Sequence, residues 1–369
     1  MEKALMVQAT EMAKNPSHPH APNHERSDNF LMTKQIQKRV TLEDVAIKAN
    51  VSRATVSRVV RQVPGVDEEI VSRVNKTIAK IGYKTNLAAR ALAGGKTQNV
   101  AIVFREDFAD IFMNGAWGQV LEGIHSILES TNHQLTLLIN KGEHAKGLPQ
   151  YLLSNHIDGA IFLGTTQDDR IPLLLQKNNI PVVVLGEPYQ AGKISCVNGN
   201  DVAAGGIAAD LLLKGKSKRI GIISGSEEIA SSVDRVRGFR SGLAAQGYSL
   251  EENLVVSGGY TLRGGYEAIE VLLKRAPNLD GVFISSDLMA VGALQNLVRM
   301  NKKVPKDISV VSYDNSPSGE FTNPTLSTIH CNPIHVGASA AELLRDLMNG
   351  GPVRSLVFPP ELIVRESTR

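Results

Sequence analysis

Seven short apolar runs from residue 100 onward constrain the fold more than any other feature of the chain. They are VAIVF at 100, LTLLI at 135, GAIFL at 159, PVVVL at 181, RIGII at 219, GVFIS at 281 and ISVVS at 308. Such runs, separated by helical patterns, are typical of buried strands in parallel sheets covered by helices on both faces. The similar segments IDGAIFLG at 157 and LDGVFISS at 279 predict two α/β halves of like construction. Ligands of such halves bind at the carboxyl ends of the strands, in the cleft between them.

Composition and cysteine content are those of an ordinary globular protein. The 369 residues, 42% of them hydrophobic and 21% charged, suffice for two or three domains. No apolar run has the length of a membrane span, and the N-terminus lacks the apolar core of a signal peptide. Cys196 and Cys331 lack CxxC spacing, which indicates a reducing compartment and no metal site. We therefore expect a cytoplasmic protein without cofactor or membrane partner.

The stretch from Thr41 to Arg61 combines two helical periods with a short turn between them. Thr41 and Asp44 have the spacing of a helix N-terminus, and Asn50 tolerates the left-handed backbone that would end the first helix. Ser52 is the expected cap of the second helix, and a third is expected from Val66 to Ile81. The pattern fits helix-turn-helix DNA binding, although a helical hairpin with a solvated basic face would look similar.

Positive charge is concentrated in this part of the chain. Residues 34 to 99 carry thirteen Lys or Arg against five Asp or Glu, a balance of +8, whereas the whole chain is only +3. A cationic head of this kind is expected where phosphates are neutralised. Residues 1 to 37 are polar and Pro-interrupted, which predicts a disordered extension in which His18, His20 and His24 form no fixed metal site. Met32 is an alternative start of the native protein.

The strings TLEDVA, AxVSxATVSRVV and GYKTNLAARALAGGKT resemble the opening segment of the LacI/GalR family of bacterial transcription regulators. The resemblance continues almost to the end of the chain and departs at Asn50, where the family usually has Gly. It implies a three-helix headpiece at 38–84, a hinge helix at 85–97 and a periplasmic-binding-protein-like α/β effector domain at 98–369. The implied subdomains are 98–198 with 332–358, and 199–331 with 359–369. By residues alone, the Ala-rich hinge is a short tether that becomes helical only when packed.

The resemblance assigns the DNA contacts. Arg53, Ala54 and Arg58 would read bases in the major groove, while Leu92 would wedge between base pairs of the minor groove. The remaining residues are assigned to phosphates, namely Ser52, Thr55, Ser57 and Asn86.

The resemblance also assigns an effector site in the cleft. Arg235 matches the ligand-clamping arginine of the family and Asp314 its hydroxyl-accepting aspartate. Tyr260 matches an aromatic that stacks on the ligand, and Ser286 a polar contact; Asp287 is expected to be a helix N-cap. Taken without the family, Arg235 could be a surface ion-pair partner and Tyr260 a core residue. Gly186 stands where several members carry a carboxylate. Residues expected on the other wall are Arg105, Asp107, Phe112 and Trp117.

These features predict an operator-binding repressor controlled by a small molecule. An arginine, an aspartate and an aromatic favour a sugar or sugar phosphate, and a purine is an alternative. A homodimer is expected because two linked headpieces that read a palindrome gain contact area. A tetramer is not expected, because the C-terminal heptad tail through which some family members form tetramers does not follow Arg369.

The rival hypotheses are a solute-binding protein, which would need an export signal, and an enzyme. No nucleophile elbow, phosphate loop or metal-ligand spacing that would indicate an enzyme is found in the sequence.

Overall fold

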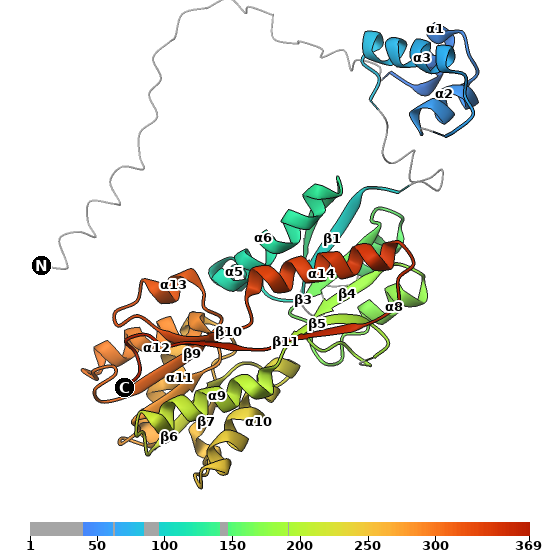
Figure 1. Cartoon of the computed structure of the whole chain (residues 1–369). Coiled ribbons are helices and arrows are strands. Elements are labelled where there is room, and N and C mark those ends of the chain that lie inside the picture. The colour runs from blue at the N-terminus through green and yellow to red at the C-terminus, as the bar shows by residue number, and fades with distance from the viewer. Residues whose placement is uncertain (1–39, 62, 85–95, 141–146, 191) are drawn as a thin grey trace, which may run out of the picture. The chain divides into compact units, whose positions relative to one another are not determined.

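The computed structural model describes residues 40–61, 63–84, 96–140, 147–190 and 192–369. The chain divides into two compact units, Met1–Thr85 and Asn86–Arg369, which are described separately (Figure 1). The hinge residues Asn86 and Leu92 and the N-terminal extension predicted at residues 1–37 lie outside the described residues.

The described part of the first unit contains three helices, α1 (Leu42–Ala49), α2 (Arg53–Val60) and α3 (Glu68–Ile81). Thr41 and Asp44 form a capping box at the start of α1, and Asn50 ends that helix with φ 51°, as predicted. The Ser52 side chain caps α2 by accepting from Thr55 N, also as predicted. The third helix begins two residues later than expected, because Asp67 rather than a residue before Val66 is its N-cap.

The three helices pack around one small core, which includes Val45, Val56 and Val74, all with no exposed surface. In α2 the buried residues are Val56 and Val59, which lie on one face of the helix and leave the opposite face outside this core.

The second unit holds two six-stranded sheets. The first has the order β11 (Ser355–Phe358), β5 (Ser195–Gly199), β4 (Val182–Leu185), β3 (Gly159–Leu163), β1 (Asn99–Phe104) and β2 (Gln134–Ile139). The second has the order β12 (Glu361–Ile363), β10 (Ser327–His330), β9 (Ser309–Tyr313), β8 (Gly281–Ile284), β6 (Ile220–Ser224) and β7 (Val255–Ser257). The paired strands are parallel except β10 with β12, which is antiparallel.

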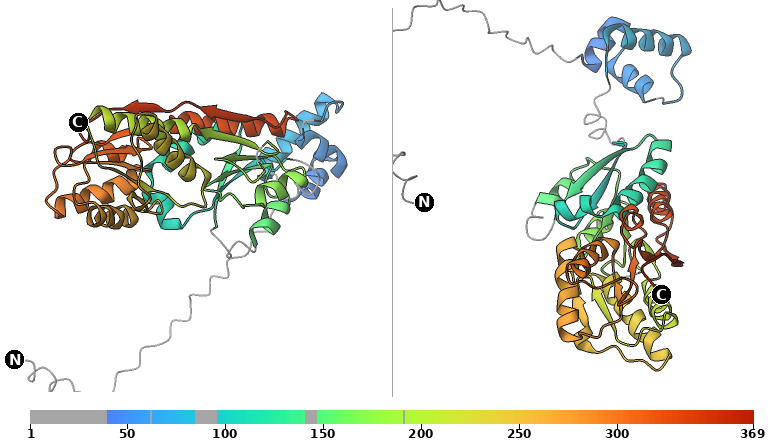
Figure 2. Two further views of the ribbon diagram at one scale, coloured as in Figure 1. Left: turned by 90° about the horizontal axis from the view of Figure 1, so that it is seen from below. Right: turned by 90° about the vertical axis from the view of Figure 1, so that its left-hand side faces the viewer.

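Helices cover both faces of each sheet, as two views show (Figure 2). The predicted α/β fold with a helix-turn-helix head and two parallel-sheet halves is confirmed. The helices of this unit are α5 (Phe108–Met113), α6 (Gly115–Ser130), α7 (Leu148–Leu153), α8 (Ile171–Lys177), α9 (Asp201–Lys214), α10 (Ala230–Ala245), α11 (Leu262–Arg275), α12 (Asp287–Arg299), α13 (Pro317–Glu320) and α14 (Pro333–Met348). Among the described residues, no helix has the length and apolarity needed to cross a membrane.

The chain passes between the two sheets at three places, and these are what bring the sheets together. It leaves the first sheet after β5, returns after β10 through α14, and leaves again between β11 and β12. We call the part around the first sheet subdomain 1 and the part around the second sheet subdomain 2. Because parallel strands of each sheet end at the same edge, loops from both subdomains meet near these crossings.

Each of the seven apolar runs forms a strand, but β5, β7, β10, β11 and β12 were not predicted. Two of these, SCVNG and STIH, are buried yet polar, so they carry no apolar run. The others lie at or next to a sheet edge and are partly exposed. Pairing with a neighbouring strand, rather than apolar content, makes these segments strands.

Candidate functional site

The second helix of the headpiece exposes the side chains predicted to read DNA. Arg53, Ala54 and Arg58 are exposed, and Thr55 and Ser57 are half-buried. The Arg53 guanidinium contacts Glu43 at 2.8 Å, and both side chains are more than half exposed, so solvent screens this ion pair. Arg58 donates from Nη2 to the Pro64 carbonyl at 3.2 Å. Ser52 uses its hydroxyl oxygen to cap α2, accepting from Thr55 N at 3.0 Å.

A cleft of about 1100 Å³, part of it open to solvent, lies between the two subdomains. Subdomain 1 contributes the residues after β1, β3 and β4 and the start of α6, while subdomain 2 contributes the residues after β6 and β9 and parts of α9 and α10. Its polar and aromatic lining consists of Glu106, Asn114, Trp117, Thr165, Glu187, Asn198, Asp201, Ser231, Arg235, Tyr260, Tyr313, Asp314 and Cys331.

Arg235 is the central cation of this cleft. It projects from α10, is only 8% exposed, and donates from Nε to Asp201 Oδ1 at 2.7 Å. Its Nη1 donates to the Ser285 carbonyl at 2.7 Å, and the guanidinium carbon lies 3.5 Å from the centroid of the Tyr313 ring. Burial is the largest influence and disfavours the charge, but the attractions of Asp201, Tyr260, Tyr313 and Asp314 together outweigh it and keep the pKa of Arg235 well above its ordinary value. Three neighbours thus fix the orientation of this side chain.

Asp314 follows strand β9 and lines the cleft with an unusual backbone, φ 113°. Its amide donates to the Ile329 carbonyl at 2.8 Å, which holds the residue at the strand end. Burial raises the pKa of Asp314 well above its usual value, although the charge of Arg235 opposes the shift. Tyr260 also has a positive φ, 61°, and its ring packs where a side chain at Gly225 would stand, since a Cβ there would lie 2.0 Å from the ring.

The structure brings together four of the seven residues predicted to bind the effector: Arg235, Tyr260, Asp314 and Trp117 all line the cleft. Ser286 does not. It is the N-cap of α12, accepting from Met289 N at 3.2 Å, so the prediction that Asp287 is the cap is wrong by one residue.

The remaining two predicted effector contacts, and Arg105 beside them, do not line the cleft. Asp107 stands at the N-terminus of α5, and Phe112, 62% exposed, packs against Phe108 with ring centroids 4.8 Å apart. Arg105 donates from Nε to Asp169 at 2.7 Å and from Nη1 to the Asn140 carbonyl at 2.7 Å. These contacts hold loops of subdomain 1 together.

Sequence reasoning missed Asp201, Tyr313 and Asn198, which all line the cleft. Tyr313 is the last residue of β9, and the cleft-lining Asp314 directly follows it, so an apolar run that ends in a polar pair was the available signal for this residue. Asp201 and Asn198 flank the first crossing between subdomains, a place the sequence pattern alone does not mark. The Asn198 side-chain oxygen is buried and has no hydrogen-bond partner among the described residues.

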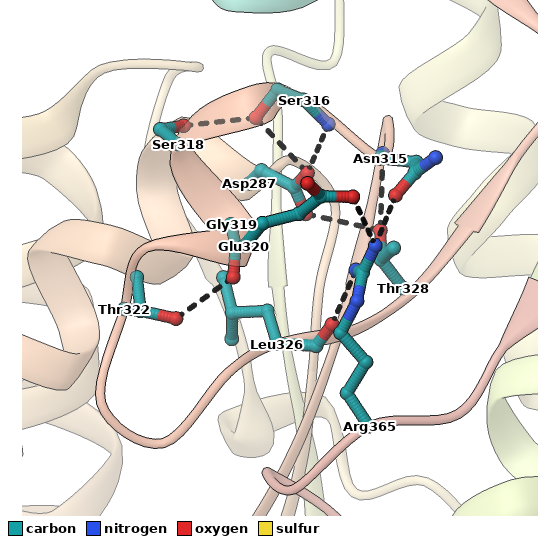
Figure 3. Close-up of polar contacts among 10 residues, drawn as sticks. All are labelled: Asp287, Asn315, Ser316, Ser318, Gly319, Glu320, Thr322, Leu326, Thr328 and Arg365. Carbon is teal, nitrogen blue, oxygen red and sulfur yellow. Dashed lines mark hydrogen bonds and ion pairs between the residues drawn. The ribbon is translucent and has the colours of Figure 1, made fainter.

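Asp287 holds the loop that follows β9, and Figure 3 shows its contacts with Ser316 and Thr328. It is fully buried at the first turn of α12, and its carboxylate accepts from the Ser312 hydroxyl, from Ser316 N at 2.6 Å and from the Thr328 hydroxyl at 3.0 Å. Ser312 and Ser316 lie two residues on either side of Asp314, so one carboxylate fixes both sides of that residue.

Arg365, in the last segment of the chain, holds the same loop from another side. It donates from Nη2 to Asn315 Oδ1 at 2.8 Å and to Glu320 at 2.9 Å, and from Nη1 to the Leu326 carbonyl at 2.8 Å (Figure 3). The left-handed backbone of Asp314 is therefore supported on both sides, as strained positions near binding sites usually are. No group of three or more His, Cys, Asp or Glu side chains suited to a metal ion occurs in the described ranges.

The chain matches two family models. Residues 41–86 match bacterial regulatory proteins of the lacI family, and residues 209–368 match the periplasmic binding protein-like domain. The HTH-type transcriptional regulator CelR of Thermobifida fusca is 34% identical over 338 residues, which are 90% of this chain and 99% of that protein. The HTH-type transcriptional repressor CytR of Escherichia coli is 29% identical over 345 residues, 92% of this chain and 99% of its own.

Solved structures agree with these matches. The structure of a transcriptional regulator CelR–cellobiose complex has a TM-score of 0.71 at 32% identity and covers 89% of this chain and 100% of its own. The lac repressor dimer bound to operator and an anti-inducer has a TM-score of 0.78 and shares the fold at 24% identity. The fold and the cleft are those of a DNA-binding regulator with a periplasmic-binding-protein-like domain. The chain belongs to the lacI family of bacterial transcriptional regulators.

Proposed function

We propose that this lacI-family regulator is a repressor that binds a palindromic operator as a homodimer and whose DNA affinity is set by a sugar or sugar derivative in the cleft between subdomains 1 and 2. One observation carries the proposal: the same chain joins a cationic helix-turn-helix head to a cleft with a fixed arginine, a carboxylate and aromatic rings. The proposed base readers are Arg53, Ala54 and Arg58, with Leu92 as the minor-groove wedge. Ser52, Thr55, Ser57 and Asn86 are the proposed phosphate contacts.

A sugar suits the cleft because its hydroxyl groups can donate to carboxylates while its ring faces pack on aromatic side chains. Asp314 and Asp201 supply carboxylates, and Trp117, Tyr260 and Tyr313 supply rings. A hydroxyl left unpaired in such a cleft costs on the order of 1–3 kcal/mol, so polar partners favour polyols over apolar molecules. The cellobiose complex of the similar CelR supports a sugar effector.

The homodimer follows from the weakness of one headpiece. A single three-helix unit makes a small contact with DNA, whereas two linked units on a palindrome gain contact area and effective concentration. The dimer of the lac repressor, which shares this fold, is consistent with that arrangement. DNA as the target makes the cytoplasm the proposed location. The relatives reported above are regulators, which supports a non-catalytic role rather than an enzyme.

The direct test is fluorescence anisotropy of the full-length protein with DNA fragments from upstream of its own gene, with and without a sugar panel. We expect salt-dependent binding to one fragment and a shift of affinity with one sugar, by about 1–3 kcal/mol. Failure to bind any duplex at low ionic strength would refute the proposal. Sugar binding without DNA binding would favour the rival hypothesis of a solute-binding protein.

The reading of bases is tested by Arg58→Ala. We expect specific binding to weaken by about 1–3 kcal/mol and the preference at one operator position to relax, because arginine can bond bidentately to guanine. Ser57→Ala is the matched control on the same helix, where loss of a phosphate contact should lower affinity for all sequences alike. An unchanged base preference in the arginine variant would remove Arg58 from the base readers.

A further inference from the structure

The charge of the cleft is strongly one-sided. Among the described residues, four carboxylate side chains, Glu106, Glu187, Asp201 and Asp314, line it together with one guanidinium, Arg235, so these five groups have a formal charge of −3 when all are ionised. Arg235 is already paired with Asp201 at 2.7 Å. The remaining carboxylates come from both subdomains, so an anionic group of a ligand would have negative charge on either side.

Some of the strong hydrogen-bond donors of the cleft are already engaged, whereas the buried Tyr260 hydroxyl has no partner among the described residues. Arg235 uses Nε on Asp201 and Nη1 on the Ser285 carbonyl, and Trp117 donates from Nε1 to Glu106 at 3.1 Å. Acceptors are in excess, because carboxylates only accept when ionised, and the buried Asn198 oxygen has no partner among the residues described. A phosphoryl or carboxylate group brings only acceptors to such a site, whereas a hydroxyl or ammonium brings donors.

Helix N-termini at the cleft favour an anion. The start of helix α10 lines the cleft with its N-cap Ile229 and its first residues Ala230 and Ser231. A helix N-terminus is equivalent to about half an elementary positive charge and acts within its first turn. The N-termini of α6, α9 and α14 also line the cleft, through Asn114, Asp201 and Pro333, so together the helix termini contribute about two positive elementary charges, which is less than the formal charge of −3 on the side chains. The carboxylates therefore determine the sign of the potential.

We propose that the effector is a sugar that carries no phosphoryl or carboxylate group, and that the acidic lining of the cleft rejects anionic sugars. This inference rests on the proposed function and narrows its ligand from any sugar derivative to neutral or amino sugars. Like charges brought together in a partly desolvated site repel strongly, so rejection is expected even when the sugar ring itself fits.

The test uses matched ligand pairs and calorimetry on the full-length protein. Cellobiitol and cellobionate have the same open-chain end and differ in charge, and glucose with glucose 6-phosphate forms a second pair. For whichever pair binds, we expect the anionic member to bind at least about tenfold more weakly, with the gap narrowing as salt is added. Glucosamine should bind no more weakly than glucose.

Variants connect the selectivity to the cleft. Glu187→Gln removes one exposed carboxylate of the lining, and we expect the ratio between neutral and anionic ligand to shrink about threefold. Glu267→Gln is the control, since this exposed glutamate of α11 does not line the cleft and should leave the ratio unchanged. Equal shrinkage in both variants would overturn the proposal.

Two other outcomes separate this inference from the proposed function. If the phosphorylated or carboxylated member of a pair binds more tightly than the neutral member, the inference is overturned. If operator binding also responds to that anionic member, the proposed function still stands. Binding of neither member of any sugar pair, with operator binding intact, overturns both the inference and the sugar-controlled part of the proposed function.

Discussion

Asp158 in subdomain 1 and Asp280 in subdomain 2 occupy equivalent places, directly before the third strand of their halves, β3 and β8. Asp158 accepts from Thr97 N at 2.6 Å and Gln98 N at 2.8 Å, and Asp280 accepts from Lys218 N at 2.9 Å and Arg219 N at 2.8 Å. In both halves one carboxylate ties the entry of the first strand to the third.

The helix pairs that flank the cleft are equally alike. A Cβ at Gly238 of α10 would meet the Val202 carbonyl at 1.9 Å, and a Cβ at Gly123 of α6 would meet the Ile334 carbonyl at 2.0 Å. Three residues before each of these glycines stands a side chain that lines the cleft. It is Arg235 in subdomain 2 and Val120 in subdomain 1.

The residue after the fourth strand repeats this contrast. Gly186 after β4 has φ 110° and donates to the Val197 carbonyl at 3.0 Å, while Asp314 after β9 has φ 113° and donates to the Ile329 carbonyl at 2.8 Å. The backbone is the same, but only subdomain 2 places a carboxylate there. The two halves thus share a scaffold and differ at these matching positions: subdomain 2 presents Arg235 and Asp314 to the cleft, where subdomain 1 has Val120 and Gly186.

The largest effect is expected at the cleft-facing helix position. Arg235→Ala should abolish the response to ligand, with at least about a hundredfold loss of sugar affinity, because the fixed cation is removed and Asp201 is left buried without its partner. Operator binding should persist. Calorimetry and anisotropy measure the two separately, and Val120→Ala is the control in subdomain 1, expected to retain the response. A full sugar response in the arginine variant would show that subdomain 2 does not hold the ligand.

The next largest effect concerns the residues three positions after β3 and β8. Asp287→Ala should lower the free energy of unfolding by about 3 kcal/mol, since Ser316 N and the hydroxyls of Ser312, Ser316 and Thr328 lose a buried acceptor. Among the described residues, the side chain of its counterpart Thr166 bonds to Asp168 alone, at 2.7 Å near the surface, so Thr166→Ala should cost under about 0.5 kcal/mol. Urea denaturation compares the two variants. Equal losses would contradict the asymmetry described here.

A smaller and symmetric effect is expected at the shared carboxylates. Asp158→Asn and Asp280→Asn each replace a charged acceptor of two backbone N–H groups by a neutral one, which should cost about 1–2 kcal/mol in either half. Thermal unfolding of the two variants side by side measures this. A loss in only one half would show that the scaffold is not equivalent after all.

The smallest effect depends on pH. Because burial raises the pKa of Asp314, its charged form is disfavoured in the folded protein relative to the unfolded chain. This loss of folding stability is fully present above the pKa that Asp314 has in the folded protein, and it disappears below the pKa that it has in the unfolded chain. Asp314→Asn should therefore raise the free energy of unfolding by about 1 kcal/mol near neutral pH, with the gain shrinking as pH falls toward about 4. A gain that grows on acidification would reverse the assigned direction of the shift.

The sequence by itself determined the framework. The seven apolar runs became strands because burial on both faces of a sheet demands such runs, and Thr41, Asn50 and Ser52 ended or capped helices through local hydrogen bonding alone. The similar segments at 157 and 279 indicated two like halves, because each contains an apolar run that is suited to a strand buried on both faces. Arg235, Tyr260 and Asp314 were found through resemblance to the family.

Only the tertiary structure decided what surrounds those residues. It paired Arg235 with Asp201, 34 positions away, and stacked it on Tyr313. It also placed Asp107 and Phe112 outside the cleft and set Ser286, not Asp287, as the helix cap. Polar strands such as β5 and β10 exist because neighbouring strands satisfy their backbone groups, and charges converge in the cleft because three crossings bring two sheets together. Such relations depend on distances through space, which spacing along the chain does not encode.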